Sequence, residues 1–314
     1  MKRVTVVTPV YNEEQNLDDF FEAVQRKIIS NKKYAFEVLL IDDGSSDKSW
    51  EMIRSYSLKD KHFKGIKLSK NHGSHHALAA GFSFARGDAI ATLACDLQDP
   101  PDMINRFLEQ WEKGVDIAWG VRKKREDSRW RIVTSKIFEY LIRKWAAPPD
   151  SKFATGSFLL MDRKVLNYYN NLKEQNRVTF AIIAYLGFTQ SQVLYERKAR
   201  VKGKSGWNFT KMIKAMYDTI IGFSYVPIRV LTFLSIIAMA AVIPLGIYVF
   251  CLYFSGGTRN IGWVSVILTI TLFGSLILFN LSFVLEYLMR VYSNTTQRPI
   301  YIISETTENL DGRE

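Results

Sequence analysis

The chain has 314 residues, of which 47% are hydrophobic and 23% are charged, and its length allows roughly two domains. This apolar content excludes intrinsic disorder over most of the chain. The 42 Lys and Arg outnumber the 31 Asp and Glu, and the net charge of +11 predicts an anionic partner, such as nucleic acid, an acidic membrane surface or a phosphorylated substrate. The two cysteines, Cys95 and Cys251, lie far apart, which argues against a disulfide framework and against a cysteine-based zinc site.

Predicted strands and helices alternate over the first 200 residues. Short apolar runs typical of buried strands occupy residues 4–8, 38–41, 65–68 and 89–95. Apolar side chains recur at helical spacing from Leu17 to Ile28 and again over residues 77–85. The alternation predicts an α/β fold with a mainly parallel, Rossmann-like sheet that helices cover on both faces. In such a sheet, ligands bind beyond the carboxyl ends of the strands.

A polar cluster follows each predicted strand. The four clusters occupy residues 9–14, 42–47, 70–73 and 96–101. Turns and helix caps favour the same residue types, so any single cluster has a structural explanation. Four clusters on one edge, several of them rich in carboxylates, indicate a bound cation or ligand, because like charges held close together repel. Carboxylate and amide oxygens suit Mg²⁺ or Mn²⁺, which commonly bind through one or two carboxylates plus the phosphates of a substrate such as a nucleoside diphosphate.

Three histidines, His72, His75 and His76, follow the third predicted strand. At spacings of three and four residues they could face one way on a helix and bind zinc. The alternative is that they open a helix near the phosphates of the ligand, where a helix N-terminus favours anions.

Two charge-free runs of 25 residues occupy residues 230–254 and 261–285. Each exceeds the roughly 20 residues that a helix needs to cross a bilayer, and their adjacency favours a transmembrane hairpin over two buried core helices. The linking loop carries one Arg, whereas Arg229, Arg290 and Arg298 lie just outside the runs, so the positive-inside rule predicts cytosolic termini. No signal peptide is recognised, because the first apolar run is short and acidic residues follow it.

An amphipathic juxtamembrane helix is predicted over residues 208–228. Its apolar face comprises Phe209, Met212, Ile213, Met216, Ile220 and Phe223. A position in the membrane interface is favoured over packing on the soluble domain. The predicted organisation is therefore a soluble domain over residues 1–207, this helix, a membrane hairpin over residues 229–290, and a cytosolic tail over residues 291–314, in which 304–314 is polar enough to be loose.

Three motifs carry a family resemblance. Residues 8–14, 41–47 and 96–101 read Thr-Pro-Val-Tyr-Asn-Glu-Glu, Ile-Asp-Asp-Gly-Ser-Ser-Asp and Asp-Leu-Gln-Asp-Pro-Pro. In this order and spacing they resemble the family 2 inverting glycosyltransferases, which have a GT-A fold. The closer resemblance is to the polyprenyl-phosphate branch, which includes dolichyl-phosphate mannose synthase and bactoprenol glucosyltransferases. It covers nearly the whole chain, because the double membrane helix and the closing Arg-Pro-Ile-Tyr at residues 298–301 recur in the bactoprenol enzymes.

The resemblance implies a role for each matching residue. Around the nucleotide it places Pro9, Tyr11, Glu13, Asp42, Asp43 and Asn71. On the metal side it places Asp96 and Gln98, with Mg²⁺ or Mn²⁺ as the cofactor. Around the sugar donor and the lipid phosphate it places Arg122, Arg131 and Ser135, and in a basic loop that closes over the site it places Arg200, Gly203 and Ser205. The alternative for the basic stretch over residues 122–131 is a solvated helix start.

The chain departs from the family pattern at three positions. Ala94 stands where the family commonly has the first Asp of Asp-x-Asp, so the metal loses one potential ligand. Ser157 stands where many bactoprenol enzymes have a catalytic Asp, which matters less for a phosphate acceptor that is already an anion at neutral pH. Gly206 replaces a Lys that is common in the closing loop, where Lys204 could substitute.

The resemblance implies an enzyme of the cell membrane that transfers a sugar from a nucleotide-diphosphate donor, with UDP-sugar favoured, to polyprenyl (undecaprenyl) phosphate on the cytosolic leaflet. The transfer inverts the anomeric configuration, and its product serves cell-envelope glycan modification. Two alternatives stay open: the same fold acting on a hydroxyl acceptor in a glycolipid or saccharide, and a catalytically dead scaffold that binds nucleotide-sugar. Nucleic acid is not an expected partner, because neither a nucleic-acid motif nor an aromatic stacking platform accompanies the basic residues. A homo-oligomer stays open.

Overall fold

The computed structural model describes residues 1–123, 158–172, 174–175, 177–197, 226–254, 262–296, 298–308 and 310. The chain divides into two compact units, one over Met1–Thr219 with Arg298–Glu314 and the other over Ile220–Gln297. The predicted boundary at residue 207 and nearly all of the predicted amphipathic helix over residues 208–228 lie outside the described residues. Those two expectations therefore stay predictions.

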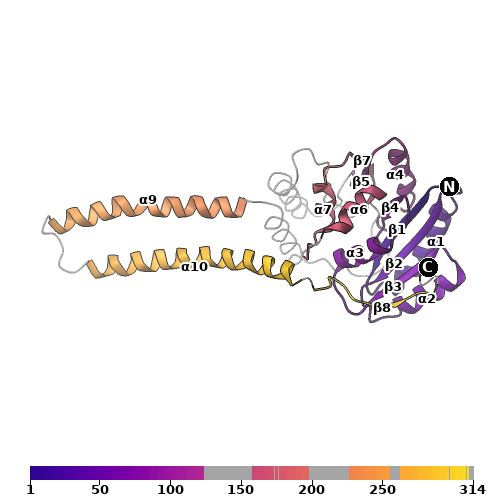
Figure 1. The fold of residues 1–314 in the computed structure, drawn as a ribbon, viewed down its shortest axis with the longest axis horizontal. Coiled ribbons are helices and arrows are strands. Elements are labelled where there is room, and N and C mark those ends of the chain that lie inside the picture. Colours follow the sequence, from indigo (N-terminus) through magenta and orange to yellow (C-terminus); the bar gives the residue numbers. More distant parts are fainter. Residues whose placement is uncertain are drawn as a thin grey trace. The chain divides into compact units, whose positions relative to one another are not determined.

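The first unit is built on a mixed sheet with a Rossmann-like core (Figure 1). Its eight strands run in the order β7-β5-β6-β4-β1-β2-β3-β8 among the described residues. The strands are β1 (Arg3–Val10), β2 (Ala35–Asp42), β3 (Phe63–Leu68), β4 (Ala89–Thr92), β5 (Ile117–Arg122), β6 (Leu159–Asp162), β7 (Gln190–Tyr195) and β8 (Ile303–Thr306). Neighbours β4, β1, β2 and β3 are parallel, whereas β6 and β8 run antiparallel to their neighbours. The α/β fold predicted from the alternation is confirmed in this coarse form.

Helices cover both faces of this sheet. They are α1 (Glu14–Val24), which continues into the π-helical η1 (Gln25–Ile29), α2 (Ser49–Lys59), α3 (Ser74–Phe84), α4 (Met103–Glu112), α6 (Arg163–Asn171) and α7 (Thr179–Tyr185). Val4, Val6 and Val10 of β1 share a core cluster with apolar residues of α1, α2 and α4. The intervening Val7 faces α3, since a Cβ on Gly81 would lie 2.4 Å from Val7 Cγ1. Burial on both faces explains the continuous apolar character of the central strands.

The segment after the second unit returns to the sheet. β8 pairs antiparallel with β3, and Trp50 Nε1 donates to Glu305 Oε2 at 2.9 Å. The Gly65 N–H donates to Thr307 Oγ1 at 2.9 Å inside the protein. The expectation that residues 304–314 are loose is therefore wrong for residues 304–307, because these backbone and side-chain contacts attach a polar strand to an otherwise open sheet edge.

The second unit contains two long helices, α9 (Val226–Phe254) and α10 (Gly262–Thr295). Among the described residues, one stretch is long and apolar enough to cross a membrane, Thr269–Thr295, and the apolar stretch of α9, Ile228–Ala238, is shorter. Large apolar side chains of α10 are exposed within the unit, with Leu278 66% exposed. This coarser finding indicates membrane association; the predicted two-span hairpin remains a proposal.

Candidate functional site

Strand register brings the four predicted polar clusters to one edge of the sheet. Val10 of β1 lies opposite Asp42 of β2, which in turn lies opposite Lys67 of β3. On the other side of β1, Val7 lies opposite Thr92, the last residue of β4. Because these strands are parallel, the loops that follow them all leave from the same edge.

The loops after β1 and β2 are bound to each other. The Asn12 N–H donates to Ser45 Oγ at 2.9 Å, and Asn12 Oδ1 accepts the Ser46 N–H at 2.9 Å. The Glu13 N–H donates to Ser49 Oγ at 3.0 Å. These contacts fix the backbone directly after Tyr11, which is 47% exposed and thus accessible to a ligand. Pro9 and Glu13, also predicted around a nucleotide, flank it in the same segment.

Asp43 connects the end of β2 to the start of α3. Its side chain is only 3% exposed, and it accepts the His72 N–H at 2.8 Å and the Gly73 N–H at 2.9 Å, one on each carboxylate oxygen. Burial raises the pKa of the Asp43 carboxyl above its usual range, and the two N–H donors oppose that rise. Asn71, exposed and directly before this connection, is thereby held at the same edge.

Asp42 differs from Asp43 in having an unsatisfied oxygen. The Ser45 N–H donates to Asp42 Oδ2 at 3.2 Å, but Asp42 Oδ1 is enclosed and has no hydrogen-bond partner among the described residues. The side chain is 0% exposed, and burial raises the pKa of its carboxyl. A buried carboxylate oxygen without a donor is costly, so this atom suits a ligand N–H or O–H.

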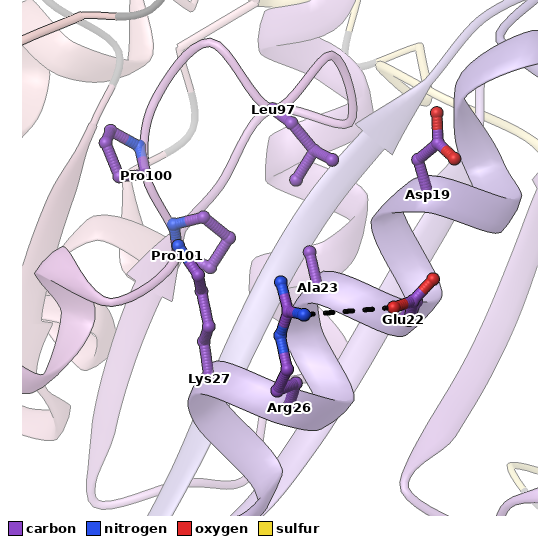
Figure 2. Close-up of a pocket in the computed structure, with 8 residues that line it drawn as sticks. All are labelled: Asp19, Glu22, Ala23, Arg26, Lys27, Leu97, Pro100 and Pro101. Atoms are coloured by element: carbon purple, nitrogen blue, oxygen red, sulfur yellow. Dashed lines mark ion pairs between the residues drawn. The ribbon is translucent and has the colours of Figure 1, made fainter.

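Asp96 and Gln98 flank Leu97 in the loop after β4. The Gln98 N–H donates to Asp96 Oδ1 at 3.2 Å, and Leu97 adopts φ 52°, so the chain reverses sharply here. The Leu97 side chain packs against the core cluster. It also borders a hollow of about 280 Å³ between this loop and α1 (Figure 2). The hollow is lined by Asp19, Glu22, Ala23, Arg26, Lys27, Leu97, Pro100 and Pro101, which include none of the predicted nucleotide or metal residues.

The availability of the other carboxylates limits how this edge could hold a metal. Among the described residues, no group of three or more His, Cys, Asp or Glu side chains is arranged to hold one. Both oxygens of Asp43 already accept backbone donors, and Asp99 accepts the Tyr195 hydroxyl. The half-buried Asp96 and Gln98 can supply one carboxylate and one amide oxygen. That donor set fits Mg²⁺ or Mn²⁺ only when substrate phosphates and water complete the coordination.

Arg122 lies at the carboxyl end of β5, and β5 runs in the same direction as β4 because both pair antiparallel with β6. It therefore reaches the same edge of the sheet. Its Nε atom is enclosed and has no hydrogen-bond partner among the described residues. The remaining predicted residues of the donor, lipid-phosphate and closing-loop set lie outside the described residues: Arg131, Ser135, Arg200, Gly203 and Ser205.

The three histidines have different environments around the start of α3. The His75 ring packs edge-on against Phe180 with centroids 5.7 Å apart, and burial lowers the pKa of His75 to about 4. His76 Nδ1 lies 2.7 Å from the His72 carbonyl oxygen. Since no metal-holding group of these residues is found in the described part of the chain, the helix-start interpretation describes them better than a zinc site.

Two side chains at and just beyond the end of β7 contact Asp99, and sequence reasoning assigned no site role to any of the three residues. Tyr195 donates its hydroxyl to Asp99 Oδ1 at 2.5 Å, and Arg197 Nε lies 3.2 Å from the same oxygen. Asp99 belongs to a motif that was recognised, but no role was assigned to it. β7 alternates exposed and buried positions over too few residues to signal a strand, and its contact with Asp99 spans 96 positions in sequence.

The fold and the polar edge define a GT-A-like α/β protein of the glycosyltransferase class. Residues 5–169 match the family described as glycosyl transferase family 2, and the chain belongs to that family. It is 32% identical over 306 residues to an uncharacterized glycosyltransferase of Synechocystis sp., covering 96% of this chain and 95% of that protein. It is 30% identical over 302 residues to the bactoprenol glucosyl transferase of Shigella phage SfX, covering 96% of this chain and 98% of that protein. Mannosyl-3-phosphoglycerate synthase from Rubrobacter xylanophilus is similar in structure, with a TM-score of 0.49, 17% identity, and coverage of 70% of this chain and 72% of that one.

Proposed function

We propose that this glycosyltransferase moves a sugar from a nucleotide-diphosphate donor, a UDP-sugar, to polyprenyl phosphate on the cytosolic leaflet, with inversion at the anomeric carbon. The observation that carries the proposal is the near-full-length similarity to a bactoprenol glucosyl transferase, together with an apolar helix long enough to enter a membrane. The product is a polyprenyl-phosphate-linked monosaccharide that serves cell-envelope glycan modification.

The nucleotide binds at the edge formed by the loops after β1, β2 and β3. Support comes from the unsatisfied Oδ1 of Asp42, which a donor group of the base or ribose would satisfy. Tyr11 offers an exposed aromatic face beside it, and Pro9, Glu13, Asp43 and Asn71 complete this part of the site.

Asp96 and Gln98 hold Mg²⁺ or Mn²⁺ together with the donor diphosphate. When bound, the cation neutralises charge that develops on the leaving diphosphate. The protein contributes a loop whose shape is fixed by the packed Leu97 between the two polar side chains, so their positions change little on binding.

The acceptor phosphate needs no protein base, because it is an anion at neutral pH. One of its oxygens attacks the anomeric carbon, a new carbon–oxygen bond forms on the opposite face of the sugar, and the bond to the diphosphate breaks with its electron pair leaving on UDP. Arg122 orients and neutralises phosphate near the reacting atoms. We assign the same work to Arg131 and Arg200, and orientation of phosphate through hydroxyl hydrogen bonds to Ser135 and Ser205; these four complete the catalytic set with Asp96, Gln98 and Arg122.

The second unit anchors the enzyme beside its lipid substrate. The proposal comprises a catalytic domain over residues 1–207, an interfacial helix over 208–228, and two spans within 229–290 that leave the catalytic domain and both termini in the cytosol. The exposed apolar side chains of α10 support it, because a surface of this kind needs lipid or a protein partner.

The decisive experiment is incorporation of sugar into lipid by the full chain purified in detergent. Nucleotide sugars are screened against undecaprenyl phosphate, and mass spectrometry identifies the lipid product. Diacylglycerol and saccharide acceptors are included in the same screen, and transfer to a hydroxyl acceptor alone would contradict the proposal. Absence of both transfer and donor hydrolysis above an Asp96→Ala background would favour a catalytically dead scaffold.

The metal assignment has its own test. Asp96→Ala should lose most of the activity that Mg²⁺ or Mn²⁺ restores after chelation, whereas Asp102→Asn should not. Asp102 is a matched control because it is an exposed carboxylate near the same loop, paired with Lys27 at 2.8 Å. Full activity of Asp96→Ala with divalent metal chelated would exclude the metal role.

A further inference from the structure

A cluster of four side chains joins three segments at the edge that carries the candidate site. Asp99 comes from the loop after β4, Arg122 ends β5, and Tyr195 and Arg197 lie at and just beyond the end of β7. β5 and β7 are parallel with Arg122 opposite Tyr195, so these two strands end level with each other. Because β6 and β5 lie between β4 and β7, Asp99 reaches across two strands to contact the end of β7.

Asp99 is fixed in place by a buried phenol. Its side chain is 1% exposed and accepts the Tyr195 hydroxyl at 2.5 Å. The Tyr195 ring packs edge-on against Phe158 with centroids 5.7 Å apart, and the glycine at 120 leaves room for it, since a Cβ there would lie 3.1 Å from Tyr195 Cε1. Burial, reinforced by the Asp99 charge, raises the pKa of Tyr195 to about 12, so the phenol stays a hydrogen-bond donor.

The cluster carries more positive than negative charge. Arg197 Nε lies 3.2 Å from Asp99 Oδ1, and the Arg122 guanidinium lies close enough to lower the pKa of Tyr195 in opposition to burial. The four side chains therefore bring two guanidinium groups together with one carboxylate. The Arg197 side chain is 27% exposed, and its Nε lies within ion-pair distance of Asp99 but has no hydrogen-bond partner among the described residues, so the guanidinium keeps N–H donors for a ligand. An anion with several acceptor oxygens matches both the excess charge and these donors.

We propose that Arg197 is a second phosphate-binding residue beside Arg122, and that Asp99 is the positioning residue that holds Arg197 at the edge of the sheet. The inference rests on the proposed function and deepens it. The ligand is a phosphate oxygen, supplied by the donor diphosphate or by the lipid phosphate. Arginine suits this role because its planar guanidinium can donate two parallel hydrogen bonds to phosphate while the charge of a nearby carboxylate holds the side chain in place.

The first test measures the two substrates separately in the full chain in detergent. KM for the donor is determined at saturating lipid phosphate, and KM for the lipid at saturating donor, in wild type, Arg197→Gln, Arg197→Lys and Arg106→Gln. Arg106 is the matched control because its Nη1 donates to the carbonyl of Leu194, beside the cluster. We expect Arg197→Gln to raise one of the two KM values by about ten- to a hundredfold, and Arg197→Lys to raise it less. The substrate affected identifies the phosphate, and two KM values within about twofold of wild type overturn the proposal.

The second test separates positioning from a merely structural role. If Asp99 acts through Arg197, the double variant Asp99→Asn/Arg197→Gln has the same KM as Arg197→Gln alone, although Asp99→Asn by itself raises KM. If the increase in KM of the double variant equals the product of the two single increases, Asp99 does not act through Arg197 and the positioning role is overturned. If Asp99→Asn does not fold, the charge-preserving Asp99→Glu replaces it in the cycle.

Failure of the proposed function gives a different result. If the wild type transfers no sugar to polyprenyl phosphate, that function is wrong, and binding of inorganic pyrophosphate to wild type and Arg197→Gln decides the inference. Weaker binding by about tenfold in Arg197→Gln supports it, and equal affinities overturn it.

Discussion

Asp43 and Gly73 are joined across the edge of the sheet, with the Gly73 N–H donating to Asp43 Oδ2 at 2.9 Å. The neighbouring His72 N–H occupies the other carboxylate oxygen. Gly73 adopts φ 93°, and nothing lies within 4 Å of the position of an added Cβ, so the backbone conformation and not space favours glycine there. One buried side chain thereby sets the path of the chain from β3 into α3 and, with it, the position of Asn71.

Removing the Asp43 carboxylate should destabilise the first unit. Asp43→Ala leaves two partly buried backbone N–H groups without their acceptor, and we expect the free energy of unfolding to fall by about 2 kcal/mol. Urea denaturation of the full chain in detergent, followed by tryptophan fluorescence, measures it. Asp19→Ala, on the exposed side of α1, is the control. Equal unfolding of the two variants would show that the bridge contributes nothing.

Unlike Asp43, Asp42 should contribute to nucleotide binding and not to the stability of the fold at neutral pH. Burial raises the pKa of this carboxyl above its usual value of 3.8, so the folded protein holds its proton to higher pH than the unfolded chain. Its contribution to stability therefore declines as pH rises from 3.8 through the raised pKa. We expect Asp42→Asn to leave the unfolding free energy at pH 7 unchanged or raised by about 1 kcal/mol, and to weaken UDP binding at least about tenfold in calorimetry. Unchanged UDP affinity would argue against its contact with the nucleotide.

His75 should make the fold sensitive to acid. Its pKa in the folded protein is about 4, below the usual 6.5, so the unfolded chain binds the extra proton between these two values. The contribution of the neutral His75 ring to the free energy of unfolding is fully present above pH 6.5 and is lost as the pH falls towards 4, by about 3 kcal/mol in total. Unfolding of wild type and His75→Gln at pH 7 and pH 5 measures the difference, with His62→Gln as control. The prediction is wrong if His75→Gln loses as much stability between pH 7 and pH 5 as the wild type and the His62→Gln control do.

Local patterns predicted the central strands and missed the contacts between distant segments. β1, β2 and β4 are largely buried on both faces, which gives the mainly apolar runs from which they were predicted, although the run over 89–95 extends past β4, where Leu93 leaves the strand. The shorter run of β3 is interrupted by the half-buried Lys64 and Lys67. The gathering of the polar clusters at one edge of the sheet was predicted correctly, because parallel strands have their carboxyl ends at the same edge. The Asp99–Tyr195 contact could not be read from the sequence, because it depends on the strand order β7-β5-β6-β4, and no local period encodes which strands become neighbours.

The same limit explains why the C-terminal segment was wrongly predicted to be a loose tail: its polar sequence does not reveal that it pairs with β3. The Gly65 N–H depends on Thr307 Oγ1, at 2.9 Å inside the protein, so Thr307→Val removes an acceptor while nearly keeping the shape of the side chain. We expect the free energy of unfolding to fall by about 1–2 kcal/mol. Ser304→Ala, which removes an exposed hydroxyl that donates to the Lys67 carbonyl at 3.2 Å, should change it by less than about 0.5 kcal/mol. Hydrogen exchange offers a direct measurement, because the Gly65 amide should exchange faster in Thr307→Val and not in Ser304→Ala. An unaltered Gly65 exchange rate in Thr307→Val would mean that the tail does not hold β3.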